Sequence, residues 1–316
     1  MEKFGNWRDK SSGVGPFLTR VKPESTISLV LRWIFGIIKF PIFIILLFAS
    51  SFNLLVGYYF PIRFIGRFLE RVNSIATYHL LLFLFGQYWT SVIPTPLIKV
   101  FLTDTKWEKP SHGEIVFTHL TSYVNLFWLQ AKLSPLYIIP TSNGKCVVRG
   151  IFSMFWKILL QKDLADGSEM SIADVVTMSK KKRRGPLVVF AEGAPTNGEG
   201  ILEFSKFSIP SKDCTVHILG FHRVFKGITP NFIAGNGFLH LIKTLGTLKA
   251  DVIVKVALKK DVPQLSDTTD NEYIEKCRGI LSKLMNIPTV EISSKDYKTF
   301  IQAFNKAPQA QHSKQE

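Results

Sequence analysis

Cysteine is scarce in this sequence. The three cysteines, Cys146, Cys214 and Cys277, lie far apart and show neither a C-x-x-C pair nor any other zinc-ligand spacing. They therefore predict neither a disulfide framework nor a metal site. N-x-S/T sequons are absent as well, and both absences fit a domain that faces the cytosol. The first 25 residues lack a short apolar run, which argues against a cleaved signal peptide.

Acidic residues are also in deficit. There are 24 aspartates and glutamates against 39 lysines and arginines, giving a formal net charge of +15, while phenylalanine is abundant with 26 residues. A chain that is both basic and apolar suits an anionic lipid surface. Nucleic-acid binding is the other usual interpretation of a high pI, but the phenylalanines and leucines cluster in uncharged runs, which argues against it.

Charge is missing altogether from Phe40 to Phe60, a run long enough for a membrane helix of about 20 residues. Arg32 and Lys39 precede this run, and arginines follow it from Arg63 onwards. Because basic residues flank both ends, the positive-inside rule favours a re-entrant hairpin with both ends in the cytosol over a single span. Pro41 is a candidate break in the helix, and a buried core helix is the alternative interpretation.

Two further segments follow the uncharged run. Pro61–Ile75 alternates arginines with apolar residues at helical spacing, which is typical of a helix lying in the membrane interface. Tyr78–Ile93 is apolar but short and is followed by prolines. Two interpretations of it stand: a second membrane segment, or a helix packed on the folded domain.

From Lys99 the composition becomes that of a globular domain in which strands alternate with helices. This alternation predicts an α/β fold with a mostly parallel central sheet flanked by helices, preceded by N-terminal membrane helices. The expected strands are Glu114–Thr118, Leu136–Ile139, Leu187–Phe190, Val216–Phe221 and Val252–Leu258, and the expected helices are Ser122–Leu133, Phe152–Gln161, Ser171–Lys180 and Tyr273–Met285. The expected organisation is a cytosolic arm (1–25), a membrane hairpin with interfacial helices (26–98), the α/β domain (99–304) and a disordered tail (305–316).

The most informative stretch is Leu187–Gly200. Four apolar residues lead into a loop rich in glycine, proline and asparagine, so a fully buried strand is expected to end there. Glu192 then lies just past the carboxyl end of that strand, where ligands bind in open α/β sheets. The sequence therefore places a probable site at this loop.

Phe190–Gly193 and Asn197–Lys206 read Phe-Ala-Glu-Gly and Asn-Gly-Glu-Gly-Ile-Leu-Glu-Phe-Ser-Lys. Together they resemble the third motif block of the PlsC-type glycerolipid (1-acylglycerol-3-phosphate) acyltransferases, Phe-Pro-Glu-Gly-Thr-Arg-Ser followed by Asp-Gly-x-Leu-x-Pro-Phe-Lys-Lys. Val216–Gly220 resembles their fourth motif without its proline. Residues 1–18 resemble the start of a fungal member of the family.

The resemblance implies an enzyme that moves a fatty acyl group from acyl-CoA to lysophosphatidic acid, giving phosphatidic acid for phospholipid and triacylglycerol synthesis. It implies acyl-CoA as co-substrate without a further cofactor or metal, and membrane lipids but no nucleic acid as partners. It also implies the endoplasmic reticulum membrane and lipid droplets as the location, with the catalytic domain facing the cytosol.

The family's first motif, Asn-His-x-Ser-x-x-Asp, supplies a histidine base oriented by an aspartate. When the serines are aligned on Ser122, Leu120 takes the base position and Asn125 the aspartate position. His119 falls one residue early. Two interpretations follow: His119 is a displaced general base held by the Asn125 carbonyl oxygen, or it is a structural histidine at a strand end.

The family's phosphate-binding arginine in the third block is replaced by Pro195, and near the second motif Lys162 is a candidate cation. The residues expected to contact substrate are Glu192, Gly193, Asn197, Gly198 and Lys206. Glu192 has the alternative role of capping backbone amides of its own loop. A catalytically degenerate acyltransferase-fold protein acting in lipid binding or vacuolar protein trafficking is the second functional hypothesis.

Overall fold

The computed structural model describes residues 4–19, 24–59, 63–97, 107–209, 214–224, 229–263 and 269–306. The α-helices are α1 (Thr26–Tyr59), α2 (Arg63–Leu84), α3 (Tyr123–Leu133), α4 (Ile151–Leu159), α5 (Ile172–Lys182), α6 (Gly237–Leu245), α7 (Asp270–Met285) and α8 (Ser294–Lys306). The strands are β1 (Thr90–Thr95), β2 (Ile115–Phe117), β3 (Leu136–Pro140), β4 (Cys146–Arg149), β5 (Glu169–Met170), β6 (Leu187–Val189), β7 (Val216–Val224) and β8 (Asp251–Ala257). Short 3-10 turns lie at Gly5–Trp7 and Lys259–Asp261.

The strands of the described residues form one sheet in the order β1-β8-β7-β2-β6-β3-β4-β5. The centre, β7-β2-β6-β3, is parallel, and β1 is parallel to β8. Three pairs are antiparallel: β7 with β8, β3 with β4, and β4 with β5. The predicted α/β class and mostly parallel sheet are therefore confirmed, with antiparallel pairings towards the edges.

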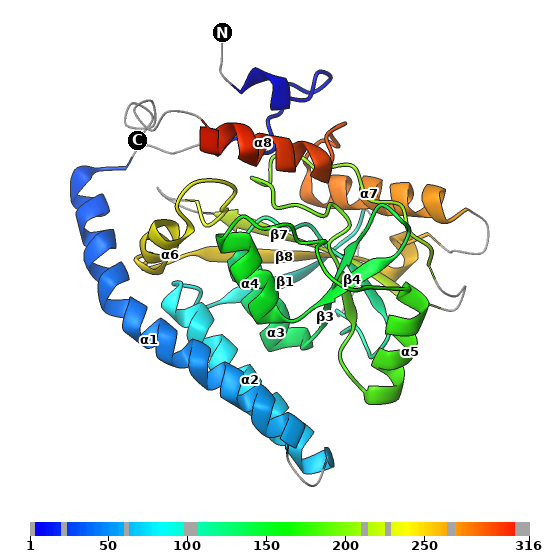
Figure 1. Ribbon diagram of the computed structural model, residues 1–316, viewed down its shortest axis with the longest axis horizontal. Coiled ribbons are helices and arrows are strands. Elements are labelled where there is room, and N and C mark those ends of the chain that lie inside the picture. Colours follow the sequence, from blue (N-terminus) through cyan, green and yellow to red (C-terminus); the bar gives the residue numbers. More distant parts are fainter. Residues whose placement is uncertain are drawn as a thin grey trace.

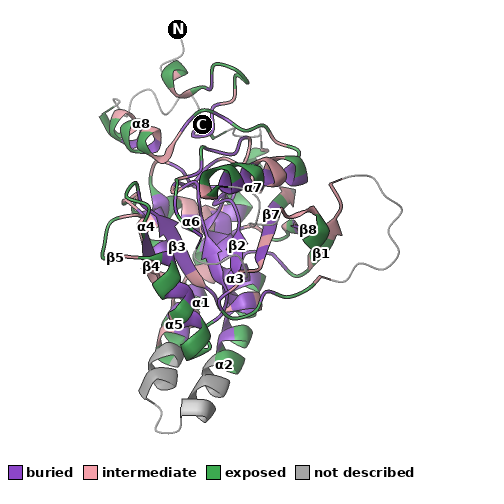
Figure 2. Cartoon of the chain, turned by 90° about the vertical axis from the view of Figure 1, so that its right-hand side faces the viewer, coloured by how far each residue is buried: buried purple, intermediate pink, exposed green. Residues whose placement is uncertain are grey.

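Helices cover both faces of the sheet (Figure 1). On one face, Val116, Val188 and Leu219 pack with residues of α3 and α4. On the other, alternate strand residues such as Phe117 and Val189 pack with α5 and α7. Figure 2 shows the buried residues concentrated on the strands and on the helix faces turned towards them. Strands β2 and β6 at the centre are apolar throughout because both of their faces are covered.

The first two helices form an antiparallel hairpin along one side of the domain (Figure 1). The expected break at Pro41 is wrong, because α1 runs through it as a single helix of 34 residues. Proline removes one helix hydrogen bond, and the neighbouring Phe43, fully buried against Phe85, Phe127 and Phe155, holds the helix on the domain.

Residues between the hairpin and the domain differ from the expectation. The two helices proposed for 61–75 and 78–93 are one helix, α2, whose last turns pack on the core through Tyr78 and Leu81. Residues 90–95 are strand β1, paired with β8 at the sheet edge. The sheet therefore begins before the predicted boundary at 99, and residues 98–106 lie outside the described part of the chain.

The predicted N-terminal arm is also packed on the domain. Phe17 is buried against Tyr297 and Phe300 of α8, and the Trp7 indole N–H donates to Thr299 Oγ1 at 3.1 Å. The Asp9 carboxylate accepts from the Glu291 backbone amide at 2.9 Å. At the other end α8 continues to Lys306, and the rest of the predicted tail lies outside the described residues.

Candidate functional site

The candidate site lies at the carboxyl edge of the parallel strands. β2 and β6 are neighbours in register, Phe117 opposite Val189. The chain leaves β2 into the His119 loop and leaves β6 into the Glu192 loop, so the topology brings both loops to one edge. β7 extends past the end of β2, because Ile218 is already opposite Phe117 and the strand continues to Val224.

Glu192 joins these loops through its carboxylate. Oε2 accepts from the Leu120 backbone N–H at 3.3 Å, and Oε1 accepts from the Leu202 backbone N–H at 2.9 Å. The side chain is fully buried, and burial raises its pKa to about 7 although both amides and Arg278 act in the opposite direction. Glu192 therefore caps backbone amides and holds the His119 loop against the glycine-rich loop.

The His119 side chain is enclosed and lies beside β7. It is 1% exposed, its ring is edge-on to Phe221 at 6.5 Å between centroids, and a Cβ at Gly220 would lie 3.3 Å from its Cε1. Burial lowers its pKa to about 4, although the Phe221 backbone acts against this shift. Within the described part of the chain neither ring nitrogen makes a hydrogen bond of ordinary geometry. His119 is therefore neutral at physiological pH.

Asn125 does not hold the imidazole, so the predicted His119–Asn125 pair is wrong. Its Nδ2 donates to Thr121 Oγ1 at 3.0 Å, and its Oδ1 accepts from Arg223 Nε at 3.0 Å and from Arg223 Nη2. A guanidinium is a stronger donor to an amide oxygen than a neutral imidazole. The Arg223 guanidinium comes from the part of β7 that extends past the end of β2.

Two residues of this cluster were missed by the sequence analysis. Arg223 occupies the far end of β7, and Gln87, with its amide oxygen turned towards the guanidinium, accepts from Nη1 at 2.6 Å and from Nη2 at 3.2 Å. The available signal was an arginine near the end of the mostly apolar run that begins at Val216. Gln87 follows α2 and gave no signal of its own.

Asn197 has a structural role in the glycine-rich loop. Its Nδ2 donates to the carbonyl oxygens of Gly15 and Leu18 at 2.9 and 2.8 Å, and its backbone N–H donates to Pro16 at 2.8 Å. Gly198 has φ +80°, a left-handed conformation that favours glycine. Asn197 therefore fastens the N-terminal segment across this loop.

Gly193 and Lys206, the other residues predicted to contact substrate, lie in different surroundings. Lys206 is exposed on the loop, whereas Gly193, with φ +66°, lines a cavity of about 220 Å³ between the Glu192 loop, α8 and the segment after α4. Gln161, Ser294 and Tyr297 also line it. The structure thus brings Gly193, but neither Asn197 nor Lys206, to the lining of this cavity.

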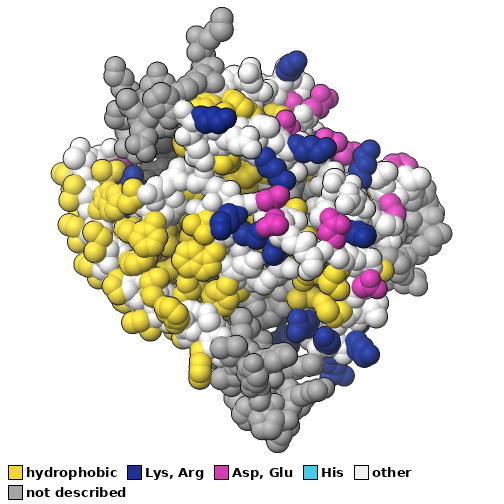
Figure 3. Space-filling model, in the orientation of Figure 1, with side chains coloured by type: hydrophobic (Ala, Val, Ile, Leu, Met, Phe, Trp, Pro, Cys, Tyr) yellow, Lys and Arg dark blue, Asp and Glu magenta, His cyan; other side chains and the backbone are white. Residues whose placement is uncertain are grey.

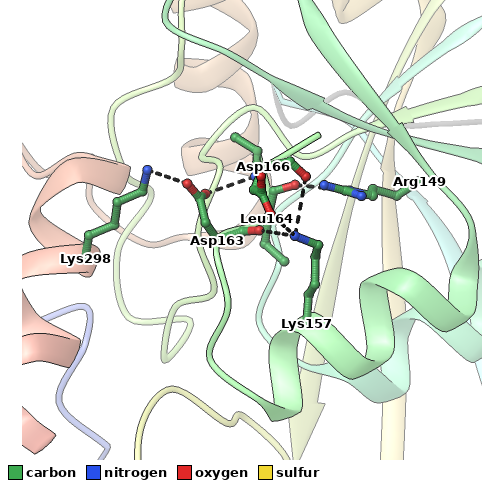
Figure 4. A network of polar contacts seen from close by, with 7 residues as sticks. Arg149, Lys157, Asp163, Leu164, Asp166 and Lys298 are labelled. Carbon is green, nitrogen blue, oxygen red and sulfur yellow. Dashed lines mark hydrogen bonds and ion pairs between the residues drawn. The ribbon is translucent and has the colours of Figure 1, made fainter. Parts of the chain in front are cut away.

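A network of charged groups includes two residues of the cavity lining, Asp163 and Lys298 (Figure 4). These two form an ion pair at 2.6 Å, and burial and Lys298 act in opposite directions on Asp163, whose pKa is lowered overall. Next to them Lys157 pairs with Asp166 at 3.3 Å, and Arg149 Nε donates to the Leu164 carbonyl. In the described residues no group of three His, Cys, Asp or Glu side chains is placed to hold a metal.

A broad apolar surface lies on one side of the molecule, over α1, α4 and α6 (Figure 3). Ile45 and Phe48 of α1 are 67% and 72% exposed, and Phe238 of α6 and Leu160, directly after α4, are exposed too. Among the described helices α1 alone, over Thr26–Phe52, is long and apolar enough to cross a membrane by length and composition. Patches of this kind mark protein or membrane contact surfaces.

Comparison with solved structures gives a similarity of chain arrangement. No family model matches this chain, and no curated protein matches it. The crystal structure of the 1-acyl-sn-glycerophosphate (LPA) acyltransferase PlsC from Thermotoga maritima superposes with a TM-score of 0.45 at 13% sequence identity, over 82% of this chain and 95% of that one. At this level of agreement the similarity fixes neither the substrate nor the reaction of the present chain.

Proposed function

We propose that this protein is a membrane-bound acyltransferase that moves a fatty acyl group from acyl-CoA to lysophosphatidic acid, at the endoplasmic reticulum and lipid droplets. The observation that carries the proposal is the Glu192 carboxylate, which binds the Leu120 amide. The two stretches that resemble the family's first and third motifs, some 70 residues apart, are joined there at the ligand-binding edge of the sheet.

In the proposed reaction the lysolipid hydroxyl oxygen attacks the thioester carbonyl carbon. The new C–O bond forms as the C–S bond breaks, and the hydroxyl proton passes to a neutral imidazole, which returns it to the leaving thiolate. His119 is the residue proposed for this role, because it is uncharged and both ring nitrogens are unbonded within the described residues. With a pKa near 4 it is a weak base, so the proposed step needs substrate to bring the ring into a more polar setting.

The apolar surface over α1, α4 and α6 supports a membrane location. An acyl chain is sparingly soluble in water, and a protein seated in the bilayer by such a surface can take its lysolipid directly from the membrane. The hairpin is fixed to the domain rather than separate from it: Lys39 Nζ donates to the Leu84 and Thr247 carbonyls at 3.0 and 3.1 Å.

A second candidate function is lipid binding without acyl transfer. Asn125 is bonded to Arg223 and not to His119, so no second residue orients the imidazole among those described. A protein that binds lysolipid at this edge without a working base would have this arrangement.

The experiment that separates the two is acyl transfer from oleoyl-CoA to lysophosphatidic acid by the purified full chain in phospholipid vesicles. Wild type, His119→Ala and Glu192→Ala are compared, with His217→Ala as the control. His217 suits this purpose because it pairs with Glu114 near the amino ends of β2 and β7, at the opposite edge of the sheet from His119. Loss of about 100-fold or more in His119→Ala, with the control unchanged, supports the base. Wild-type protein that binds lysolipid but transfers no acyl group would establish lipid binding instead.

A further inference from the structure

Arg223 is a charged side chain set among neutral groups at the carboxyl edge of the sheet. Its Nε and Nη2 donate to the Asn125 amide oxygen, and Gln87 accepts from Nη1 and Nη2 on another side. Part of the residue remains exposed, while the guanidinium lies deep enough that burial lowers its pKa to about 9. Arg223 is therefore still charged at neutral pH.

In the part of the chain that the structure describes, no carboxylate balances this charge. Over the described ranges no Asp or Glu lies within ion-pair distance of Arg223, and Asn125 and Gln87 offer dipoles only. Arg278, near the same loops, differs, because it pairs with Glu275 at 2.7 Å and donates to the Leu202 and Val290 carbonyls. Burying a cation without an opposite charge is costly, so an anionic ligand is the partner that the Arg223 cluster lacks.

Asn125 is the reason the charge is unbalanced. An aspartate at this position, where the resemblance places one, would receive the same two N–H donors and neutralise the guanidinium. Asparagine keeps the hydrogen bonds and leaves the positive charge unmatched. The chain also has Pro195 where the resemblance places a phosphate-binding arginine. The glycine-rich loop thus lacks the expected arginine, while β7, beside the His119 loop, carries an arginine whose charge is not neutralised.

The surroundings of Gln87 suit an amphiphile. Tyr88 and Trp89 follow it and are 42% and 86% exposed, and a Cβ at the preceding Gly86 would touch Leu248, which is also exposed. Exposed aromatic and aliphatic groups therefore flank Gln87, whose amide oxygen accepts from the guanidinium. A lysolipid with its chain on this apolar rim would bring its headgroup to the edge where Arg223 lies.

We propose that Arg223, flanked by Asn125 and Gln87, binds the phosphate group of the lysolipid substrate next to His119. The identity of the lipid rests on the proposed function, whereas the chemistry of the site, a guanidinium that takes a phosphate group, does not. Arg223 replaces the arginine that the glycine-rich loop lacks, and it selects phosphorylated over uncharged lysolipids.

The decisive variant is Asn125→Asp, which gives Arg223 a carboxylate from within the protein. Binding of lysophosphatidic acid and of a monoacylglycerol with the same acyl chain is measured on the full-length chain in detergent micelles, without acyl-CoA. We expect wild type to prefer the phosphorylated lipid, and we expect Asn125→Asp and Arg223→Gln to reduce that preference about 10-fold or more while monoacylglycerol binding stays unchanged. Arg223→Lys should retain part of the preference for the phosphorylated lipid.

Controls separate the outcomes. Asn125→Asp is expected to keep or raise the melting temperature, so its loss of binding cannot be attributed to unfolding, and Asn143→Asp on an exposed turn should change nothing. Inorganic phosphate is added as a competitor of lysophosphatidic acid binding. Strong competition by phosphate would identify a free-phosphate site, whereas weak competition supports the lipid headgroup as the ligand. An undiminished preference in both Asn125→Asp and Arg223→Gln, or its loss in Lys206→Gln instead, would overturn the proposal.

The same variants distinguish this proposal from failure of the proposed enzyme. If Asn125 were a weakened partner of His119, Asn125→Asp would increase acyl transfer. If Arg223 binds the phosphate, the same substitution decreases it, and the binding measurement stands whether or not transfer is observed.

Discussion

Two titratable residues at the site edge, Glu192 and His119, are moved by burial in opposite directions. Burial raises the pKa of Glu192 to about 7 and lowers the pKa of His119 to about 4. Each shift favours the neutral form, and the two side chains are linked through the His119 loop. At neutral pH His119 is therefore uncharged and Glu192 is only partly ionised, and Arg223 is the nearby cation.

The two shifts have opposite effects on stability between about pH 4.5 and 6.5. Glu192 binds its proton more tightly in the folded state, so its stabilisation is present below pH 4.5 and is lost as the pH rises through 7. His119 binds its proton less tightly in the folded state, so its stabilisation is present above pH 6.5 and is lost as the pH falls towards 4. Each is worth up to about 3 kcal/mol.

We therefore predict that Glu192→Gln changes the way the free energy of unfolding depends on pH, and not only its value at one pH. In wild type the two trends largely cancel, whereas in Glu192→Gln the free energy of unfolding should rise by about 2–3 kcal/mol between pH 4.5 and 6.5, because only the His119 trend remains. Denaturant unfolding in detergent at several pH values measures this. A constant difference between variant and wild type across that range would contradict a raised Glu192 pKa.

The site was only partly predictable from the sequence. Glu192 follows an apolar strand and a glycine-rich loop, and those local signals placed it at the sheet edge. The partner of Asn125 was not predictable, because Arg223 is 98 residues away in the sequence and reaches Asn125 only when β7 extends beyond β2. The roles of Glu192, Gly193, Asn197, Gly198 and Lys206 towards a substrate stay predictions.

At the scale of elements, the apolar strands β2, β3, β6, β7 and β8 and the helices α3, α4, α5 and α7 were predicted correctly. β1 was missed because its residues, Thr-Ser-Val-Ile-Pro-Thr, read as the end of an apolar segment and include a proline, which an edge strand tolerates. α6 and α8 were missed because their pattern is short or mostly polar, and tertiary packing stabilises them.

The packing of α1 on α6 depends on close approach at Gly36. A Cβ at this position would collide with the Ile242 carbonyl oxygen of α6. We predict that Gly36→Val lowers the free energy of unfolding by about 2 kcal/mol, because the helices must separate. Thermal unfolding in detergent measures the loss.

Gly279→Ala is the matched control, since a Cβ there meets nothing within 4 Å on helix α7. Alanine at that position should stabilise the protein by up to about 1 kcal/mol. Equal effects of the two substitutions would show that the α1–α6 contact is not close in solution.

At the scale of the whole molecule, the proposed membrane binding has two separable sources, the apolar surface and the net charge of +15. Ile37, Ile38 and Ile45 are exposed on α1. We predict that changing all three to serine weakens binding to uncharged phospholipid vesicles by about 100-fold, because each isoleucine contributes through burial of apolar area. Vesicle co-sedimentation measures the partitioning.

The control removes charge instead. Lys260, Lys276 and Lys283 lie around a groove beside α7 and are exposed. Serine at these positions should leave binding to uncharged vesicles unchanged, and any loss should be confined to anionic vesicles at low salt. If the variant with serine at Ile37, Ile38 and Ile45 binds uncharged vesicles as tightly as wild type, this surface is excluded as the membrane contact.

The docking of residues 4–19 onto the folded domain sets an order of events during synthesis. Asp9 bonds to the Glu291 amide, 282 residues further along, and Trp7 bonds to Thr299, 292 residues further along. At the usual rate of translation these partners emerge roughly 15 to 60 s after the segment itself. Helix α1 is therefore synthesised well before the segment in front of it can dock on the folded domain. Gly15 and Leu18 likewise precede the Asn197 loop, and they accept its hydrogen bonds only after that loop has been made.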